Sequence, residues 1–174
     1  MTAKRTKSKA APTVQDFDRE FRAQIGQMTG GLAPAAFSNA WADWATHLAC
    51  SPAKQLELQQ HAADRVQDTL AFAMRAMTGA EMPSSEGLDG EADRRFEAKD
   101  WLKFPFNVYA RAYQNNAALL KEAVDDVEGV TDYNGRLLQF AVRMLLDASS
   151  PSNYLATNPE LLTLTREEQG QNLL

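Results

Sequence analysis

Apolar side chains recur at helical spacing along most of this chain, and this periodicity limits its possible folds more than any other feature. Within residues 14–28 the large apolar residues Phe17, Phe21, Ile25 and Met28 are spaced by four, four and three positions. Their spacing places them on one face of an α-helix that ends before Gly30 and Gly31. A second helix is expected over 34–49. No stretch alternates apolar and polar residues as a half-buried strand does, so the sequence predicts an all-α protein.

The most regular pattern lies in residues 52–77, where apolar residues repeat in heptads. One set of positions holds Leu56, Ala63, Leu70 and Met77, and the other holds Gln59, Val66 and Ala73. Ser51 and Pro52 mark the start of this helix, and we expect the Ser51 hydroxyl to cap its first free amides. Such a helix is about 38 Å long, more than a compact domain of this size usually needs. The pattern therefore indicates either a partner or a protruding hairpin.

Turn-forming residues divide the chain into four segments. We expect a disordered basic tail at 1–13, N-terminal helices over 14–78, an exposed linker at 79–92 and a second helical region over 93–174. The second region is predicted to contain a helical pair, over 106–127 and 131–148, with Thr131 as an N-cap. An extended segment near 149–158 follows. Asn158 and Pro159 then begin the last helix as its N-cap and first residue.

Charge and hydropathy exclude several classes of protein. Four basic residues lie in the first ten positions, so the rest of the chain has 14 basic and 23 acidic residues. An acidic body argues against nucleic-acid binding, which needs Lys and Arg along the phosphate backbone. No apolar run reaches the roughly 20 residues that span a bilayer, and the basic N-terminus lacks the apolar region of a secretory signal. We therefore expect a cytoplasmic protein without a transmembrane segment.

Residues with catalytic or metal-binding chemistry are few. Cys50 is the single cysteine, has no glycine elbow around it and is expected to be a buried or half-buried structural thiol. His47 lies three positions before Cys50, and His61 is expected on the polar face of the long helix. Arg94 or Arg95 is expected to pair with a nearby acid such as Asp93. The sequence thus predicts no catalytic residue, no metal site and no cofactor.

Three segments nevertheless resemble a known family. They are Asp93–Phe96 with Trp101, the run Ser150-Pro-Ser-Asn-Tyr-Leu-Ala-Thr-Asn-Pro-Glu160, and the closing Gly170–Leu173. These residues resemble the N-terminal region of class I polyhydroxyalkanoate synthases, which polymerise 3-hydroxyacyl groups from coenzyme A into storage polyester. The resemblance is close over 93–174 and looser over 51–77.

The resemblance implies a division of labour along the family's longer chain. Catalysis in those acyltransferases belongs to a C-terminal α/β-hydrolase-like domain with a cysteine nucleophile, and we expect that domain to be absent from these 174 residues. The segment alone is therefore predicted to be inactive. Its implied roles are dimerisation, granule attachment and support of the catalytic domain, at polyester granules in the cytoplasm. The alternative is a stand-alone helical adaptor with no link to polymerisation.

Two sets of residues are the candidate interface. The heptad set is Leu56, Ala63, Val66, Leu70 and Met77, and the C-terminal set is Tyr154, Leu155, Asn158 and Pro159. The partners expected for the heptad set are a second synthase subunit, granule-associated proteins or the polyester surface. The C-terminal set is expected to pack against the catalytic domain. Trp101, Phe104 and Phe106 suit either that interface or the helical core, and we favour the core.

Overall fold

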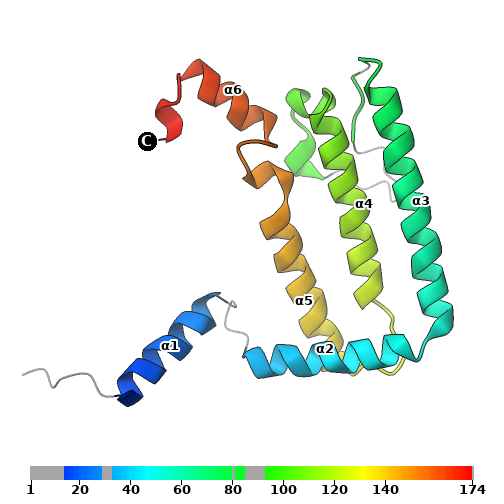
Figure 1. Ribbon diagram of the computed structural model, residues 1–174, viewed down its shortest axis with the longest axis vertical. Helices are drawn as coiled ribbons and strands as arrows, with labels where there is room; N and C mark the ends of the chain where they lie inside the picture. The colour runs from blue at the N-terminus through cyan, green and yellow to red at the C-terminus, as the bar shows by residue number, and fades with distance from the viewer. Residues whose placement is uncertain (1–13, 29–32, 80, 85–92, 174) are drawn as a thin grey trace, which may run out of the picture. The chain divides into compact units, whose positions relative to one another are not determined.

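The computed structural model describes residues 14–28, 33–79, 81–84 and 93–173, and these residues form helices and no strand (Figure 1). The α-helices are α1 (Val14–Met28), α2 (Pro34–Ala49), α3 (Pro52–Ala76), α4 (Phe106–Val124), α5 (Asp132–Ser149) and α6 (Pro159–Glu167). The described residues also form four 3₁₀ turns: η1 (Arg94–Phe96) and η2 (Lys99–Leu102) before α4, η3 (Pro151–Asn153) before α6, and η4 (Gln171–Leu173) after it. The all-α prediction and the long helix are confirmed. The predicted basic tail at 1–13 lies outside the described residues.

The chain forms two units, residues 1–39 and residues 40–174. In the first unit, α1 presents Phe17 and Phe21 on one exposed face, with their ring centroids 6.5 Å apart. This helix agrees with the prediction over 14–28. The side chain of Ile25, which the sequence placed on the same face, lies outside the described residues.

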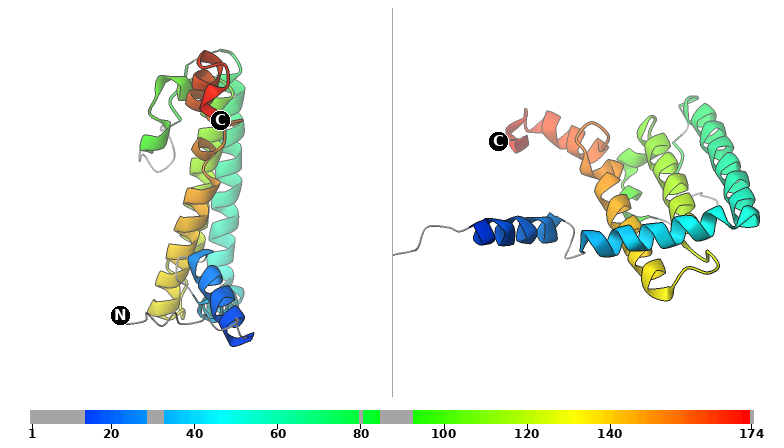
Figure 2. Two further views of the ribbon diagram at one scale, coloured as in Figure 1. Left: turned by 90° about the vertical axis from the view of Figure 1, so that its left-hand side faces the viewer. Right: turned by 60° about the horizontal axis from the view of Figure 1, so that its bottom comes forward.

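The second unit contains a layer of three helices, α3, α4 and α5, with α4 in the middle (Figures 1 and 2). Neighbouring helices in the layer are antiparallel, because α4 begins at the end of the layer where α3 ends, and α5 begins at the end where α4 ends. The C-terminal part of α2 crosses one end of the layer. There the Trp44 indole donates a 2.8 Å hydrogen bond to the Ala123 carbonyl, and Asp43 accepts hydrogen bonds from Thr131 and Asn134.

An apolar core fills the other end of the layer, around η1 and η2. Its buried members are Phe96, Trp101, Ala110, Tyr113, Ala117 and Leu146. The Trp101 indole donates a 3.0 Å hydrogen bond to Glu160 of α6, and the Tyr113 hydroxyl donates one of 2.9 Å to the Leu146 carbonyl. Trp101 and the half-buried Phe106 therefore belong to the core, as favoured. Phe104 precedes α4, is 49% exposed and is not among the residues of the cluster, so the same expectation was wrong for it.

Several local predictions need correction. The segment near 149–158 is not extended: Pro151–Asn153 form a 3₁₀ turn, and the amides of Thr157 and Asn158 donate to the Tyr154 carbonyl. The side chains of this polar segment satisfy backbone groups, for example Asn153 at the Asp147 carbonyl, and so stabilise a compact turn.

Two further corrections concern the linker and the start of α3. The Ser51 hydroxyl makes no cap on α3, because it donates back to the His47 carbonyl at 2.8 Å. In the described part of the expected linker, Ser84 is buried and its carbonyl accepts a hydrogen bond from Arg111. Residues 81–84 are therefore held against α4, and residues 85–92 lie outside the described part of the chain.

Candidate interaction surfaces

Helix α3 has a polar inner face toward α4. The inner face holds His61, Arg65, Asp68, Phe72 and Ala76, which recur at intervals of four, three, four and four residues. Of these, Phe72 and Ala76 are buried apolar residues near one end of the helix. Arg65 and Asp68 make ion pairs to α4, and Nδ1 of His61 contacts Oε1 of Glu122 on α4. The contact between α3 and α4 is therefore largely electrostatic, with a short apolar section.

The centre of that contact is an Arg–Asp pair with an amide beside it. Arg111 donates to both carboxylate oxygens of Asp68, at 2.7 and 2.6 Å, and its guanidinium lies 5.2 Å from the centre of the Phe72 ring. Asn115 donates to Asp68 at 2.8 Å and to Thr69 at 2.9 Å. The hydrogen bonds from Arg111, followed by that from Asn115, lower the pKa of Asp68 against the opposing effect of burial.

The outer face of α3 is apolar and exposed. The heptad set predicted from the sequence lies on this face, and we call Leu56, Ala63, Val66, Leu70 and Met77 the α3 stripe. Its four larger members are between 55% and 69% exposed. Met74 beside the stripe is also exposed. Among the described residues of the second unit, none covers these side chains, and the partner expected for this helix stays a prediction.

The C-terminal candidate residues divide into two kinds. Tyr154 and Leu155 are exposed. Asn158 is buried as the N-cap of α6, where its Oδ1 accepts from the amides of Glu160 and Leu161, and Pro159 is the buried first residue of that helix. The predicted cap is thus confirmed, and only Tyr154 and Leu155 lie on the surface. The structure does not bring them to the α3 stripe, because α3 lies on the far side of α4 (Figure 1).

A third apolar surface was not recognised from the sequence. On α5, Tyr133, Phe140, Met144 and Leu145 are exposed, whereas Leu137, Leu138 and Leu146 are buried. The interval from Tyr133 to Phe140 is seven residues and that from Phe140 to Met144 is four, which defines a second stripe beside the buried one. This second set of apolar positions was the signal in the sequence for an exposed apolar surface, because a helix at the edge of a single layer buries only one face.

Cys50 and His47, the residues with catalytic or metal-binding chemistry near the end of α2, do not form a catalytic pair. Cys50 is exposed, contrary to the expected structural thiol, because it follows the last residue of α2 at a turn on the surface. Within the described residues its thiol has no side-chain hydrogen bond. The Nδ1 atom of His47 lies 2.8 Å from the carbonyl of Asp43. The pKa of Asp43 is lowered mainly by the hydrogen bond from Asn134 and then by that from Thr131. These groups hold α2 to α5 and form no nucleophile–base pair.

The expected pairing of Arg95 is confirmed. Arg95 donates to Asp93 from Nε at 3.0 Å and from Nη2 at 2.7 Å, and its guanidinium lies 5.2 Å from the centre of the Tyr113 ring. Burial opposes ionisation of Asp93, but the hydrogen bonds from Arg95 outweigh it and lower the pKa of the carboxyl. The same bonds raise the pKa of Arg95. An open cavity of about 1220 Å³ beside this pair has both cationic and anionic walls, which include Arg143 and Asp147.

Among the described residues, no helix is both long enough and apolar enough to cross a membrane.

Comparison with known families covers most of the chain. Residues 12–54 match the family model described as "Poly-beta-hydroxybutyrate polymerase N terminal", and residues 92–174 match "Poly-beta-hydroxybutyrate polymerase (PhaC) N-terminus". The second match includes the residues on which the resemblance was based. No solved structure matches the chain.

Individual relatives share the same region. The chain is 32% identical over 124 residues to the poly(3-hydroxyalkanoate) polymerase subunit PhaC of Rhizobium meliloti. The aligned region covers 71% of this chain and 20% of that protein. The chain is 40% identical over 83 residues to the poly(3-hydroxyalkanoate) polymerase of Methylorubrum extorquens, and 40% over 82 residues to the subunit of Cupriavidus necator. In both cases this is 47% of this chain and 14% of the relative. The matched region thus amounts to a fifth or less of each of these relatives.

Proposed function

We propose that this chain, which belongs to the N-terminal region of the poly-beta-hydroxybutyrate polymerase family, acts in the assembly of the polymerase rather than in catalysis. In this proposal it is the helical, non-catalytic part of an acyltransferase that polymerises 3-hydroxyacyl-coenzyme A. It joins two synthase subunits and supports the catalytic domain at polyester granules in the cytoplasm. The observation that carries the proposal is the exposed α3 stripe.

The two faces of α3 support a partner for this helix. A helix that packs in a protein normally turns its apolar face inward. Here the inner face meets α4 mainly through ion pairs, while Leu56, Val66 and Leu70 point outward. Contiguous exposed apolar surface of this kind is typical of a protein–protein contact.

A second copy of the chain is the partner that the heptad favours. On one side of the stripe the exposed flanking positions are Gln60, Gln67 and Met74, and on the other side the exposed acids Glu57 and Asp64 follow Leu56 and Ala63. Gln60, Gln67 and Met74 are uncharged, so two copies of α3 can meet along this side of the stripe without like-charge repulsion. Granule-associated proteins and the polyester surface remain the other proposed partners of this face.

The surface near η3 is proposed to contact the catalytic domain. Tyr154 and Leu155 are exposed in a turn that is fixed by its own hydrogen bonds, including that from the Tyr154 hydroxyl to the Ala148 carbonyl at 2.9 Å. A rigid turn with exposed apolar side chains loses little conformational entropy when it binds. Phe140 and Met144 on α5, the helix that leads into this turn, are also exposed and offer further apolar surface.

Self-association is the test of the proposed function. Sedimentation velocity of the 174-residue chain over a concentration series is expected to show a monomer–dimer equilibrium. Leu70→Glu places a charge in the stripe and is expected to weaken dimerisation more than tenfold. Gln67→Glu adds the same charge to the same helix beside the stripe, and is expected to have a smaller effect. A chain that stays monomeric at high concentration, or equal effects of the two variants, would refute the role of the stripe.

The proposed lack of catalysis has its own assay. The chain mixed with 3-hydroxybutyryl-coenzyme A is expected to release no thiol above the background, in the wild type and in Cys50→Ser alike. Turnover that Cys50→Ser abolishes would show that the exposed thiol is a nucleophile and would overturn the non-catalytic proposal. A stand-alone adaptor, the alternative function, would dimerise in the same way but would not bind to a separately produced synthase catalytic domain.

A further inference from the structure

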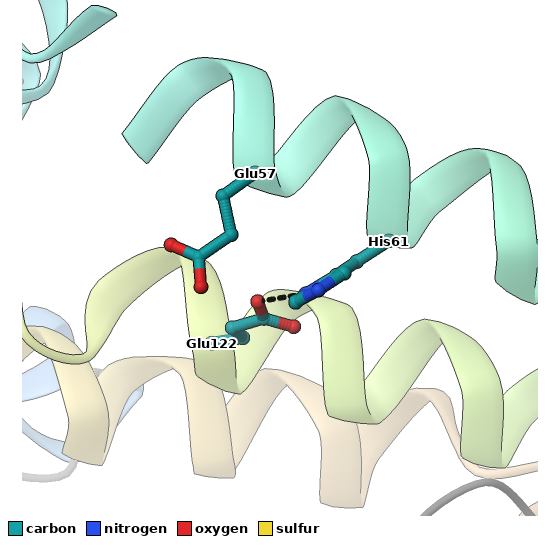
Figure 3. A group of neighbouring side chains, drawn as sticks. All are labelled: Glu57, His61 and Glu122. Atoms are coloured by element: carbon teal, nitrogen blue, oxygen red, sulfur yellow. Dashed lines mark hydrogen bonds and ion pairs between the residues drawn. The ribbon is translucent and has the colours of Figure 1, made fainter. Parts of the chain in front are cut away.

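Three metal-binding side chains from two helices converge at one point of the α3–α4 contact. Glu57 and His61 lie one turn apart on α3, and Glu122 faces them from α4 (Figure 3). Each offers one donor atom, and these atoms all lie within 4.8 Å of one another. We propose that Glu57, His61 and Glu122 form a binding site for a divalent transition-metal ion, with zinc as the cation, that clamps α3 to α4.

The kinds of donor favour zinc over the harder divalent ions. Zinc is bound by imidazole nitrogen at about 2.0–2.1 Å and by carboxylate oxygen at about 2.0–2.2 Å, in tetrahedral sites. Two carboxylates and one imidazole fill three of the four positions and leave one for water or for another ligand. Magnesium, by contrast, requires six ligands in an octahedron and prefers oxygen. A site with one nitrogen and three protein ligands therefore selects for zinc-like ions.

The geometry requires only small side-chain movements. Tetrahedral donors at these bond lengths are about 3.3 Å apart. The Nδ1 atom of His61 and the Oε1 atom of Glu122 contact each other directly, so binding needs this pair to separate slightly while Glu57 approaches. The side chains of Glu57 and His61 are 49% and 44% exposed, so they are free to adjust and the ion has access from solvent.

Neighbouring cations orient the two carboxylates without occupying both oxygens. The Nζ atom of Lys54 lies 3.4 Å from Oε2 of Glu57, and Nη2 of Arg65 lies 3.5 Å from Oε2 of Glu122. Glu122 therefore keeps its Oε1 toward His61. Outer partners of this kind fix the direction of a ligand carboxylate. Their positive charge also limits the affinity, so we expect micromolar rather than nanomolar binding.

The chain offers a matched comparison in its other histidine. His47 and Asp43 on α2 also lie one turn apart, with 3.0 Å between Nδ1 of His47 and Oδ1 of Asp43. No third ligand lies within reach of this pair among the described residues, where Glu57, His61 and Glu122 form the one cluster of three possible metal ligands. The third ligand from a second helix is thus what distinguishes the proposed site from a helical His–acid pair.

Isothermal titration with zinc chloride tests the site. The full 174-residue chain is used in a Cys50→Ser background, so that the exposed thiol does not bind the ion. We expect one zinc per chain and no binding of magnesium. Because loss of an outer-shell partner alone costs about 10–100-fold in affinity, His61→Gln and Glu57→Gln should each weaken zinc binding more than tenfold. His47→Gln should leave the affinity unchanged.

A second readout separates the site from a simple ion pair between His61 and Glu122. Zinc is expected to raise the Tm of the parent protein, because it binds the folded state, and to raise the Tm of Glu57→Gln much less at the same zinc concentration. Glu57 is exposed and is not needed for the His61–Glu122 contact, so this variant keeps the fold, which circular dichroism checks. Absence of stoichiometric zinc binding, a zinc affinity that Glu57→Gln or His61→Gln leaves unchanged, or an equal loss of affinity in His47→Gln would overturn the proposal.

Discussion

The guanidinium of Arg111 on α4 donates two hydrogen bonds, of 2.7 and 2.6 Å, to the carboxylate of Asp68 on α3. The Arg111 side chain is only 4% exposed and that of Asp68 is 19% exposed. A charge so deeply buried is stable only with its partner in place. The pair therefore sets the register of α3 on α4 and, with it, the direction in which the α3 stripe faces.

Asp68→Asn is expected to destabilise the chain strongly, because it leaves the buried Arg111 charge without a counter-ion. The expected loss is about 3 kcal/mol in the free energy of unfolding, measured by urea denaturation. Asp64→Asn removes an exposed acid from the same helix and should change this free energy by less than about 0.5 kcal/mol. The double variant Asp68→Leu, Arg111→Met should recover much of the loss, and its failure to do so would contradict an electrostatic origin.

Acid should remove the contribution of this pair. The pKa of Asp68 is lowered by Arg111, so the stabilisation is complete above the ordinary aspartate pKa of about 3.9 and is lost as the pH falls through the lowered value. The difference in unfolding free energy between the wild type and Asp68→Asn is expected to be constant from pH 7 to about pH 5. It should shrink below about pH 4. A difference that stays constant down to pH 3 would show that ionisation of Asp68 does not contribute.

The helices could be predicted from the sequence because they are determined by local patterns. The heptad over 52–77 indicated both the extent of α3 and its exposed apolar face, and Asn158 with Pro159 indicated the start of α6. The inner face of α3 was not predicted. Arg111 lies 43 residues from Asp68, and Glu122 lies 61 residues from His61. No local spacing contains such pairs, which depend on how the antiparallel helices align.

The compact turn near 151–158 escaped prediction for a different reason. Its Ser, Asn and Thr side chains were interpreted as a break in the helical pattern and hence as an extended chain. In the structure they bind nearby carbonyls, as Asn158 Nδ2 does at Ser152 and Thr157 Oγ1 at Pro151, both at 2.7 Å. Polar residues of this kind build turns as readily as they end helices.

Gln114→Met is expected to stabilise the protein. Both polar atoms of the Gln114 amide are buried and have no hydrogen-bond partner among the described residues. Replacing an unsatisfied buried amide by an apolar side chain of similar size removes a desolvation cost, so we expect a gain of about 1 kcal/mol in the free energy of unfolding. The adjacent Asn115 is the control, since its amide donates to Asp68 and Thr69. Asn115→Leu should destabilise, and a gain in both variants would point to hydrophobicity alone.

Gly129→Ala should destabilise the connection between α4 and α5, for two independent reasons. Gly129 has φ +92°, which residues with a Cβ rarely adopt, and an added Cβ would collide with the imidazole ring of His47. Together these are expected to cost about 2 kcal/mol or more in the free energy of unfolding. The control is Gly135→Ala in α5, where an added Cβ meets only Val130 at 3.9 Å. That change should stabilise by about 0.5–1 kcal/mol, because alanine favours the helix. Truncating the ring by His47→Ala in the Gly129→Ala variant should recover the steric part of the loss but not the backbone part. Equal denaturation midpoints for Gly129→Ala and Gly135→Ala would show that the α4–α5 connection accommodates the added Cβ without loss of stability, and would contradict the prediction.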